Sequence, residues 1–126
     1  MAKKKEGGKK ILMLLSRQAL RAKEFHLLLS KAGYNVVASP DMTKFTSNDA
    51  IDLIIVDCDD SVSQSTSDRL REIRGRFPSV YLMLLSRAPI PISHQISLQS
   101  DYNVNAALVR PIDPDVLLDH VHALLD

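Results

Sequence analysis

The hydrophobic positions of this chain form short continuous runs, separated by segments with helical spacing. Three runs have the length of strands that are buried on both faces, at residues 11–15, 52–56 and 80–85. Two shorter runs, at residues 35–38 and 106–109, predict two further strands. Continuous apolar runs are typical of parallel strands, because both faces of a parallel sheet are normally covered. The pattern therefore predicts a parallel sheet of five strands.

Apolar residues between these runs recur at the spacing of helices. The first helix is predicted at residues 18–32, before Gly33, and the second at residues 61–77. The last helix is predicted to be capped by Asp113, with Pro114 at its first position. Its apolar face comprises Leu117, Leu118, Val121, Leu124 and Leu125. Strands that alternate with helices imply right-handed crossovers, and hence an α/β fold with helices on both faces of the sheet.

Two segments lack a clear pattern. Residues 42–50 are polar and only weakly helical in character. Residues 88–105 contain Pro89, Pro91 and many serine, glutamine and asparagine residues. This composition argues against a regular helix in residues 88–105.

Composition narrows the classes of protein to consider. A chain of 126 residues, 45% hydrophobic and 25% charged, is typical of a single globular domain. A net charge of +1 gives no bulk attraction to nucleic acid or membrane, and no apolar run approaches the ~20 residues that span a bilayer. The opening MAKKKEGGKK predicts a flexible basic tail over residues 1–10, followed by one domain over residues 11–126. The single cysteine, Cys58, and the lack of a signal-peptide pattern favour the cytoplasm.

Polar residues follow several of the predicted strands. Sites in parallel sheets form outside the carboxyl ends of the strands, so these residues are the candidates for chemistry. The stretch IDLIIVDCDD places Asp57, Asp59 and Asp60 after the third strand, while Ser86 and Arg110 follow the fourth and fifth. Asp57 is either a reactive carboxylate or a structural acid satisfied by Arg110 or by backbone amides. Ser86 either binds a phosphoryl oxygen or caps a loop.

Four local matches between residues 11 and 125 resemble the receiver domain of two-component response regulators. They are IDLIIVD at residues 51–57, LLS at residues 84–86, VRPIDPD at residues 109–115 and KAGY at residues 31–34. The resemblance implies a flavodoxin-like (βα)5 three-layer sandwich with strand order 2-1-3-4-5. It also implies that a histidine kinase phosphorylates Asp57 with the help of Mg²⁺, Ser86 and the residue at Arg110. The metal ligands it implies are the Asp57 carboxylate and the backbone carbonyl of Asp59.

The sequence departs from the family pattern at the residues that serve the acceptor. The acidic pair that holds the metal in the family falls on residues 15–17, which contain no acid. The lysine that contacts the phosphoryl group is Arg110, whose planar guanidinium differs from a compact ammonium. The aromatic switch residue is Ala107, and the small residue after the hydroxyl is Arg87. The acceptor is therefore present, but most of its supporting groups are not.

These departures predict an altered role. A hard cation with one carboxylate ligand is bound weakly, so Mg²⁺ is not expected as a stable cofactor. We predict instead that Arg17 or Arg110 neutralises Asp57 as an internal ion pair. The chain then acts mainly as a protein-interaction module and not as an enzyme. The alternative is a working phospho-receiver that accepts phosphate on Asp57 from a histidine kinase.

The resemblance also implies where partners bind. Receiver domains use a face built from the fourth helix, the fifth strand and the last helix, and a second copy of the chain is an alternative occupant of that face. No nucleic-acid or membrane partner is expected. A third hypothesis is a small flavodoxin-like binding domain, but no glycine-rich phosphate loop follows the first predicted strand.

Overall fold

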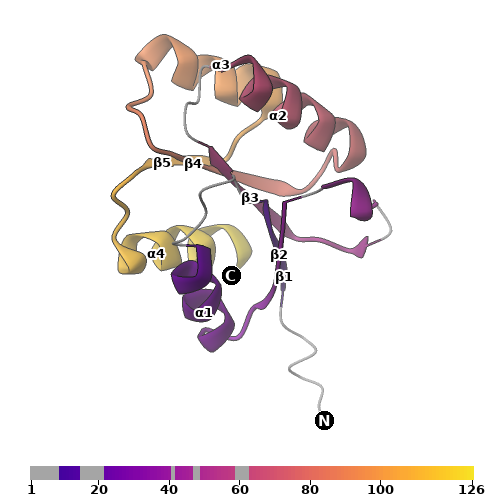
Figure 1. The fold of residues 1–126 in the computed structure, drawn as a ribbon, viewed down its shortest axis with the longest axis vertical. Helices are drawn as coiled ribbons and strands as arrows, with labels where there is room; N and C mark the ends of the chain where they lie inside the picture. Colours follow the sequence, from indigo (N-terminus) through magenta and orange to yellow (C-terminus); the bar gives the residue numbers. More distant parts are fainter. Residues whose placement is uncertain (1–8, 15–21, 41, 47–48, 59–62) are drawn as a thin grey trace.

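Five strands form one parallel sheet in the order β2-β1-β3-β4-β5 (Figure 1). The computed structural model describes the chain apart from residues 1–8, 15–21, 41, 47–48 and 59–62. The strands are β1 (Lys10–Leu14), β2 (Asn35–Ser39), β3 (Leu53–Cys58), β4 (Tyr81–Ser86) and β5 (Ala106–Val109). The predicted fold class, a flavodoxin-like α/β sandwich with strand order 2-1-3-4-5, is confirmed.

Helices cover both faces of this sheet. Among the described residues they are α1 (Ala22–Lys31), α2 (Gln64–Arg76), α3 (Ile92–Tyr102) and α4 (Pro114–Leu125), with a short 3-10 helix η2 (Met42–Lys44). Figure 1 shows α2 and α3 on one side of the sheet and α1 with α4 on the other. The weakly helical segment at residues 42–50 thus contributes η2 where it is described. No helix in the described ranges is long and apolar enough to cross a membrane.

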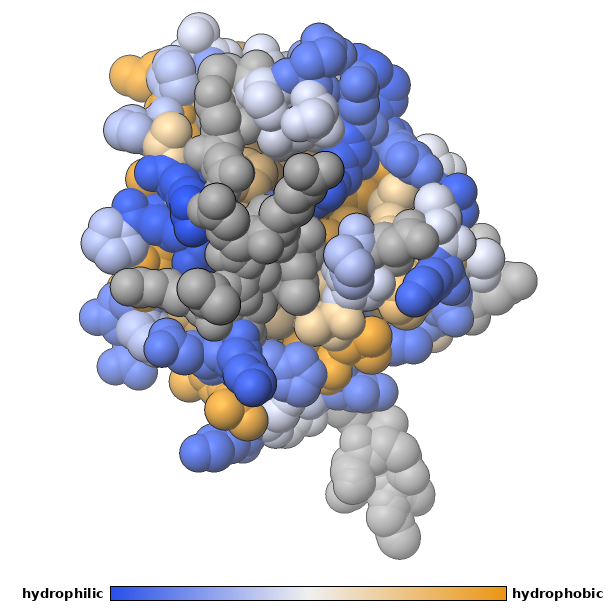
Figure 2. Space-filling view, in the orientation of Figure 1, coloured by the Kyte–Doolittle hydropathy of each residue, from blue (hydrophilic) through white to orange (hydrophobic). Residues whose placement is uncertain are grey.

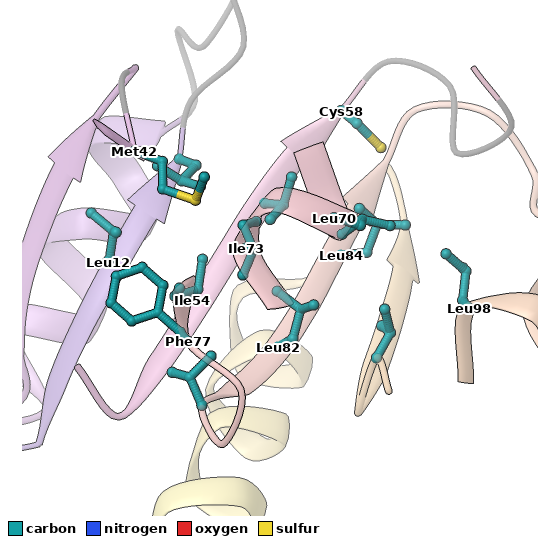
Figure 3. Packing of buried hydrophobic residues seen from close by; sticks show 14 of the residues in the cluster. Leu12, Met42, Ile54, Cys58, Leu70, Ile73, Phe77, Leu82, Leu84 and Leu98 are labelled. Carbon is teal, nitrogen blue, oxygen red and sulfur yellow. The ribbon is translucent and has the colours of Figure 1, made fainter. Parts of the chain in front are cut away.

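Alternate residues of each strand point to opposite faces, and both faces are buried. On one face, strand residues such as Ile54, Leu82 and Leu84 pack against Leu70 and Ile73 of α2 (Figure 3). The other face packs against α1 and α4 through Phe25, Leu29, Leu117, Val121 and Leu125. This double burial explains why the sequences of the central strands β1, β3 and β4 are almost continuously apolar. The outer surface of α2 is hydrophilic, as the upper right of Figure 2 shows.

The last helix begins as its sequence predicts. Asp113 is the N-cap and accepts a hydrogen bond from the Asp115 backbone N–H at 2.8 Å, and Pro114 is the first helical residue. Earlier along the chain, Gly33 follows α1 with a φ of 102°, a conformation that favours glycine. The predicted starts of the first and second helices, at residues 18 and 61, lie outside the described residues. Within them, α2 has Ser63 as its N-cap, which accepts from the Thr66 N–H.

The composition of residues 88–105 made a regular helix doubtful, but α3 occupies Ile92–Tyr102. Pro91 is the N-cap residue, so neither proline removes an N–H that the helix needs. At the other end Asn103 adopts a left-handed conformation with φ 54°. Its N–H bonds to the Gln99 and Leu98 carbonyls and ends the helix. The prolines therefore define where α3 begins.

Candidate functional site

Strand register brings the three predicted site residues to one edge of the sheet. Asp57 is paired with Leu85, and Cys58 with Ser86, in the ladder between β3 and β4. The Arg110 N–H donates to the Ser86 carbonyl at 2.7 Å, which continues the β4–β5 pairing beyond the last residue of β5. The strands β3 and β4 both continue past the apolar runs that predicted them. Asp57 and Ser86 are therefore strand residues and not the loop residues that the sequence suggested.

Asp57 forms a buried ion pair with Arg110. The Arg110 Nη2 lies 3.0 Å from the Asp57 Oδ1, and the side chains are only 14% and 8% exposed. A buried carboxylate without a countercharge is strongly destabilising, so the guanidinium satisfies a charge that the fold has placed in its interior. This is one of the two pairings that the sequence predicted. The other partner, Arg17, lies outside the described residues.

The guanidinium of Arg110 also rests on an aromatic ring. Its Cζ lies 5.5 Å from the centroid of Phe25, a buried residue of α1. A cation above an aromatic face is attracted by the negative charge of that face. The Arg110 Nε is buried and has no hydrogen-bond partner among the described residues. The Arg110–Pro111 peptide bond that follows is cis.

The hydroxyl of Ser86 is used within its own loop. Ser86 is fully buried, and its Oγ donates to the Ala88 carbonyl at 2.8 Å. Of the two roles predicted for this residue, the structure contains the loop cap. The neighbouring Arg87 N–H donates to the Cys58 carbonyl at 3.3 Å, which fixes the loop against the end of β3.

The described residues do not fit a magnesium centre. No group of three or more His, Cys, Asp or Glu in the described ranges could hold a metal ion. Asp57 directs Oδ1 at a guanidinium, a cation that already neutralises the carboxylate. The second candidate ligand, Asp59, and its neighbour Asp60 lie outside the described residues. Mg²⁺ prefers several oxygen ligands in octahedral geometry, and one engaged carboxylate does not supply them.

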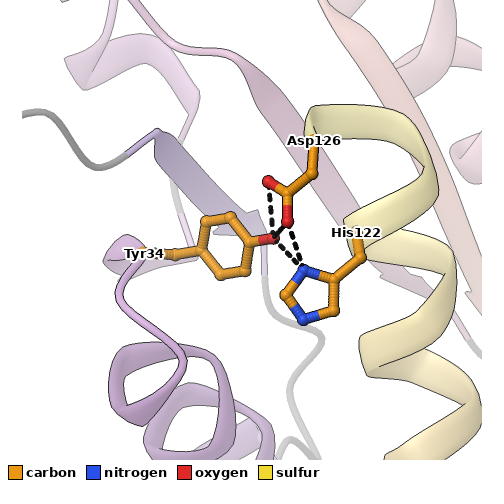
Figure 4. Close-up of polar contacts among 3 residues, drawn as sticks. All are labelled: Tyr34, His122 and Asp126. Carbon is orange, nitrogen blue, oxygen red and sulfur yellow. Dashed lines mark hydrogen bonds and ion pairs between the residues drawn. The ribbon is translucent and has the colours of Figure 1, made fainter.

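A second polar cluster lies away from this site and was not predicted. The Tyr34 hydroxyl lies 2.7 Å from His122 Nδ1 and 3.2 Å from both carboxylate oxygens of Asp126 (Figure 4). Burial, with the charge and hydrogen bond of Asp126, raises the pKa of Tyr34 to about 12. The cluster ties α4 to the turn before β2. The only sequence signal for it was the i,i+4 spacing of His122 and Asp126.

Exposed apolar side chains occur on each element of the face predicted to bind partners. The helix between β4 and β5, counted fourth in the family, is α3 here. It exposes Ile92 and Ile96, by 76% and 61%, while Val109 of β5 and Val116 of α4 are also exposed. We call these four residues the α3–β5–α4 face. A groove of about 210 Å³ between α3 and β5 is lined by residues that include Ile90, Leu98 and Val109.

Solved receiver domains share this architecture. A response regulator from Thermotoga maritima is 22% identical with a TM-score of 0.74, and the match covers 94% of this chain and 98% of that one. The chemotaxis protein CheY4 of Vibrio cholerae is 22% identical with a TM-score of 0.71, covering 94% and 99%. HP1043, an orphan response regulator of H. pylori, is 13% identical with a TM-score of 0.76, covering 95% and 98%.

The chain therefore has the fold of response-regulator receiver domains. No model of a known protein family matches the sequence, and no curated protein matches it either.

Proposed function

We propose that residues 11–126 form an atypical receiver domain that works in signal transduction mainly as a protein-interaction module, with weak or no Mg²⁺-dependent phosphorylation. The observation that carries this proposal is the ion pair between Arg110 and Asp57. A phospho-accepting carboxylate needs an oxygen free to reach phosphorus and an adjacent cation that neutralises the incoming phosphoryl group. Here a guanidinium of the chain itself holds the carboxylate.

The surroundings of the pair support the same proposal. Phe25 supports the guanidinium from one side, and the Ser86 hydroxyl is committed to the Ala88 carbonyl. A phosphoryl group that enters at Oδ1 would have to displace the guanidinium or compete with it. Both processes cost energy, because the pair is largely removed from water. Among the described residues, no group of acids could bind a metal ion that would replace the guanidinium as the cation at this site.

We propose that the protein partner binds at the α3–β5–α4 face. Exposed large apolar residues are normal singly, but their presence on all three adjoining elements favours an interface. A second copy of the chain is the alternative occupant. Sedimentation of the wild type and of Ile96→Glu separates these occupants, with Leu27→Glu on α1 as a control at another exposed apolar residue. A dimer that only Ile96→Glu dissociates identifies the second copy, and a monomeric wild type excludes it.

The alternative function is a working phospho-receiver that accepts phosphate from a histidine kinase. One observation favours it: Asp57 lies at the carboxyl end of β3, at the same edge as Ser86 and Arg110. In that reaction a carboxylate oxygen attacks phosphorus and the bond from phosphorus to the donor breaks.

Intact-mass spectrometry after incubation with acetyl phosphate and Mg²⁺ tests the two functions. The wild type and Asp57→Asn are compared, with circular dichroism confirming that both are folded. We expect no phosphoryl adduct on either protein. An adduct on the wild type that Asp57→Asn lacks establishes the phospho-receiver and rejects the interaction-only role. Arg110→Lys is the third sample, and we expect it to remain unlabelled because the missing acids are not restored.

A further inference from the structure

Arg74, on the last turn of α2, donates hydrogen bonds to carbonyls of two separate segments. Its Nε lies 2.6 Å from the Tyr102 carbonyl and its Nη2 lies 2.8 Å from the Asn103 carbonyl, both at the end of α3. Its Nη1 contacts carbonyls that follow α2, at Phe77, Pro78 and Val80, at 3.1, 3.3 and 2.6 Å. One guanidinium therefore joins the C-terminal ends of α2 and α3 to the start of β4.

These carbonyls are suited to a cation. The last carbonyls of a helix have no partner within the helix and carry the negative end of its dipole. Arg74 forms no ion pair with a carboxylate in the described part of the chain. Burial lowers the pKa of Arg74, but a guanidinium remains charged in proteins. Its charge is thus balanced by backbone dipoles, and the fork of N–H groups fits several acceptors at once.

The body of α3 is otherwise weakly attached. Leu98 is its only fully buried residue and Tyr102 packs partly buried against the core, whereas α4 buries Leu117, Val121 and Leu125. Its N-cap, Pro91, makes no side-chain capping bond. Ile92 and Ile96 face solvent. The polar contacts at the C-terminal end of α3 therefore carry a large part of its attachment to the domain.

We propose that Arg74 is a positioning residue that fixes α3, and with it the exposed Ile92 and Ile96, on the domain. Without this contact α3 opens as a local unit while the sheet stays folded, because segments with little buried apolar surface open independently. That Arg74 thereby affects partner binding rests on the proposed function of the α3–β5–α4 face. That Arg74 fixes the position of α3 does not rest on that function.

Amide hydrogen exchange tests this role on the full chain. We compare the wild type, Arg74→Gln and Arg74→Lys, with Arg71→Gln as a matched control, since Arg71 is an exposed arginine of the same helix. Arg74→Gln should accelerate exchange at residues 92–105 by at least about tenfold, the equivalent of one hydrogen bond to a charged group. Arg74→Lys should give a smaller increase, because it keeps the charge and loses the fork. The control should change nothing there.

A purely structural contribution of Arg74 to the whole fold predicts a different pattern. It would accelerate exchange equally in β1, β3 and α3, and that result overturns the proposal, as does unchanged exchange in α3. Methyl NMR gives a second readout: the Ile96 methyl signal should shift in Arg74→Gln while the Val116 signal on α4 does not. If Arg74→Gln fails to fold, Arg74→Lys decides alone. Neither readout depends on phosphorylation, so failure here is distinct from failure of the proposed function.

Discussion

Removing the guanidinium of Arg110 should destabilise the fold strongly, because it leaves a buried charge behind. Asp57 is 8% exposed, so after Arg110→Met its carboxylate has lost its countercharge and has little access to water. Breaking a buried pair in this way costs about 3–5 kcal/mol. Methionine keeps an apolar contact with Phe25, which offsets part of the lost attraction between cation and ring. The loss remains below the ~5–15 kcal/mol by which domains are stable, so the variant should fold.

A double-mutant cycle isolates the pair from these other effects. In an Asp57→Asn background the buried carboxylate is already gone, so Arg110→Met leaves no unpaired charge behind and should cost only about 1 kcal/mol. The coupling free energy is the difference between the two costs, about 2–4 kcal/mol. Urea unfolding followed by far-ultraviolet circular dichroism measures all four proteins, since the chain has no tryptophan to report unfolding by fluorescence.

The control for the cycle is the exposed pair of Asp68 and Arg71. Their side chains are 58% and 66% exposed, and exposed pairs separated by three or four residues on a helix contribute about 0.3–0.5 kcal/mol. A coupling below about 0.5 kcal/mol for Asp57 and Arg110 would place them in the same class as this control. The carboxylate would then be satisfied by other groups, and Arg110 would not be what fixes the site.

Three further predictions test the core, the Tyr34 cluster and the metal site. Leu117→Ala should lower the free energy of unfolding in urea by ~2–5 kcal/mol, and the exposed Val116→Ala should change it by no more than ~0.5 kcal/mol. Equal losses for the two variants would show that Leu117 is not on the buried face of α4. A Tyr34 pKa raised from 10.0 to about 12 means that neutral Tyr34 contributes stability below pH 10.0, lost as pH rises towards 12. Tyrosinate absorbance should show this late transition, and Asp126→Asn should bring it earlier; an unchanged transition contradicts the assigned cause. Mg²⁺ at millimolar concentration should give no saturable amide NMR shifts around Asp57. Saturable shifts there would contradict the conclusion that these residues fit a magnesium site poorly.

The hydrophobic pattern predicted the sheet well because the central strands β1, β3 and β4 are buried on both faces. The apolar runs at residues 52–56 and 80–85 contain most of β3 and β4. The pattern stops at Val56 because Asp57 is charged, yet the backbone ladder continues to Cys58 and Ser86. For α3 the sequence misled for a different reason. Proline disfavours a helix interior, but Pro91 stands at the N-cap, where its missing N–H is not needed.

The candidate site was predictable in position and less so in its contacts. The family motifs placed Asp57, Ser86 and Arg110 at one sheet edge, and the register confirms that placement. The ring of Phe25 below the guanidinium was not predictable, because on the sequence it is one inner-face residue of a helix like any other. Likewise Arg74 and Tyr102 are 28 positions apart, and nothing local marks them as partners.

The distinction between a bound metal and a built-in guanidinium bears on how such a domain is regulated. A metal exchanges with solution, so its site responds to phosphate and to metal concentration. Arg110 is part of the chain, so under the proposed function the Asp57 site takes one state whenever the protein folds. Regulation must then enter through an equilibrium that a partner can bias. Helix α3 has one buried side chain and exposed apolar residues, and we propose that Arg74 holds it in place. A partner that contacts Ile92 and Ile96 binds only when α3 is in place. Its affinity for the domain then depends on how firmly α3 is attached, and no chemistry at Asp57 is needed.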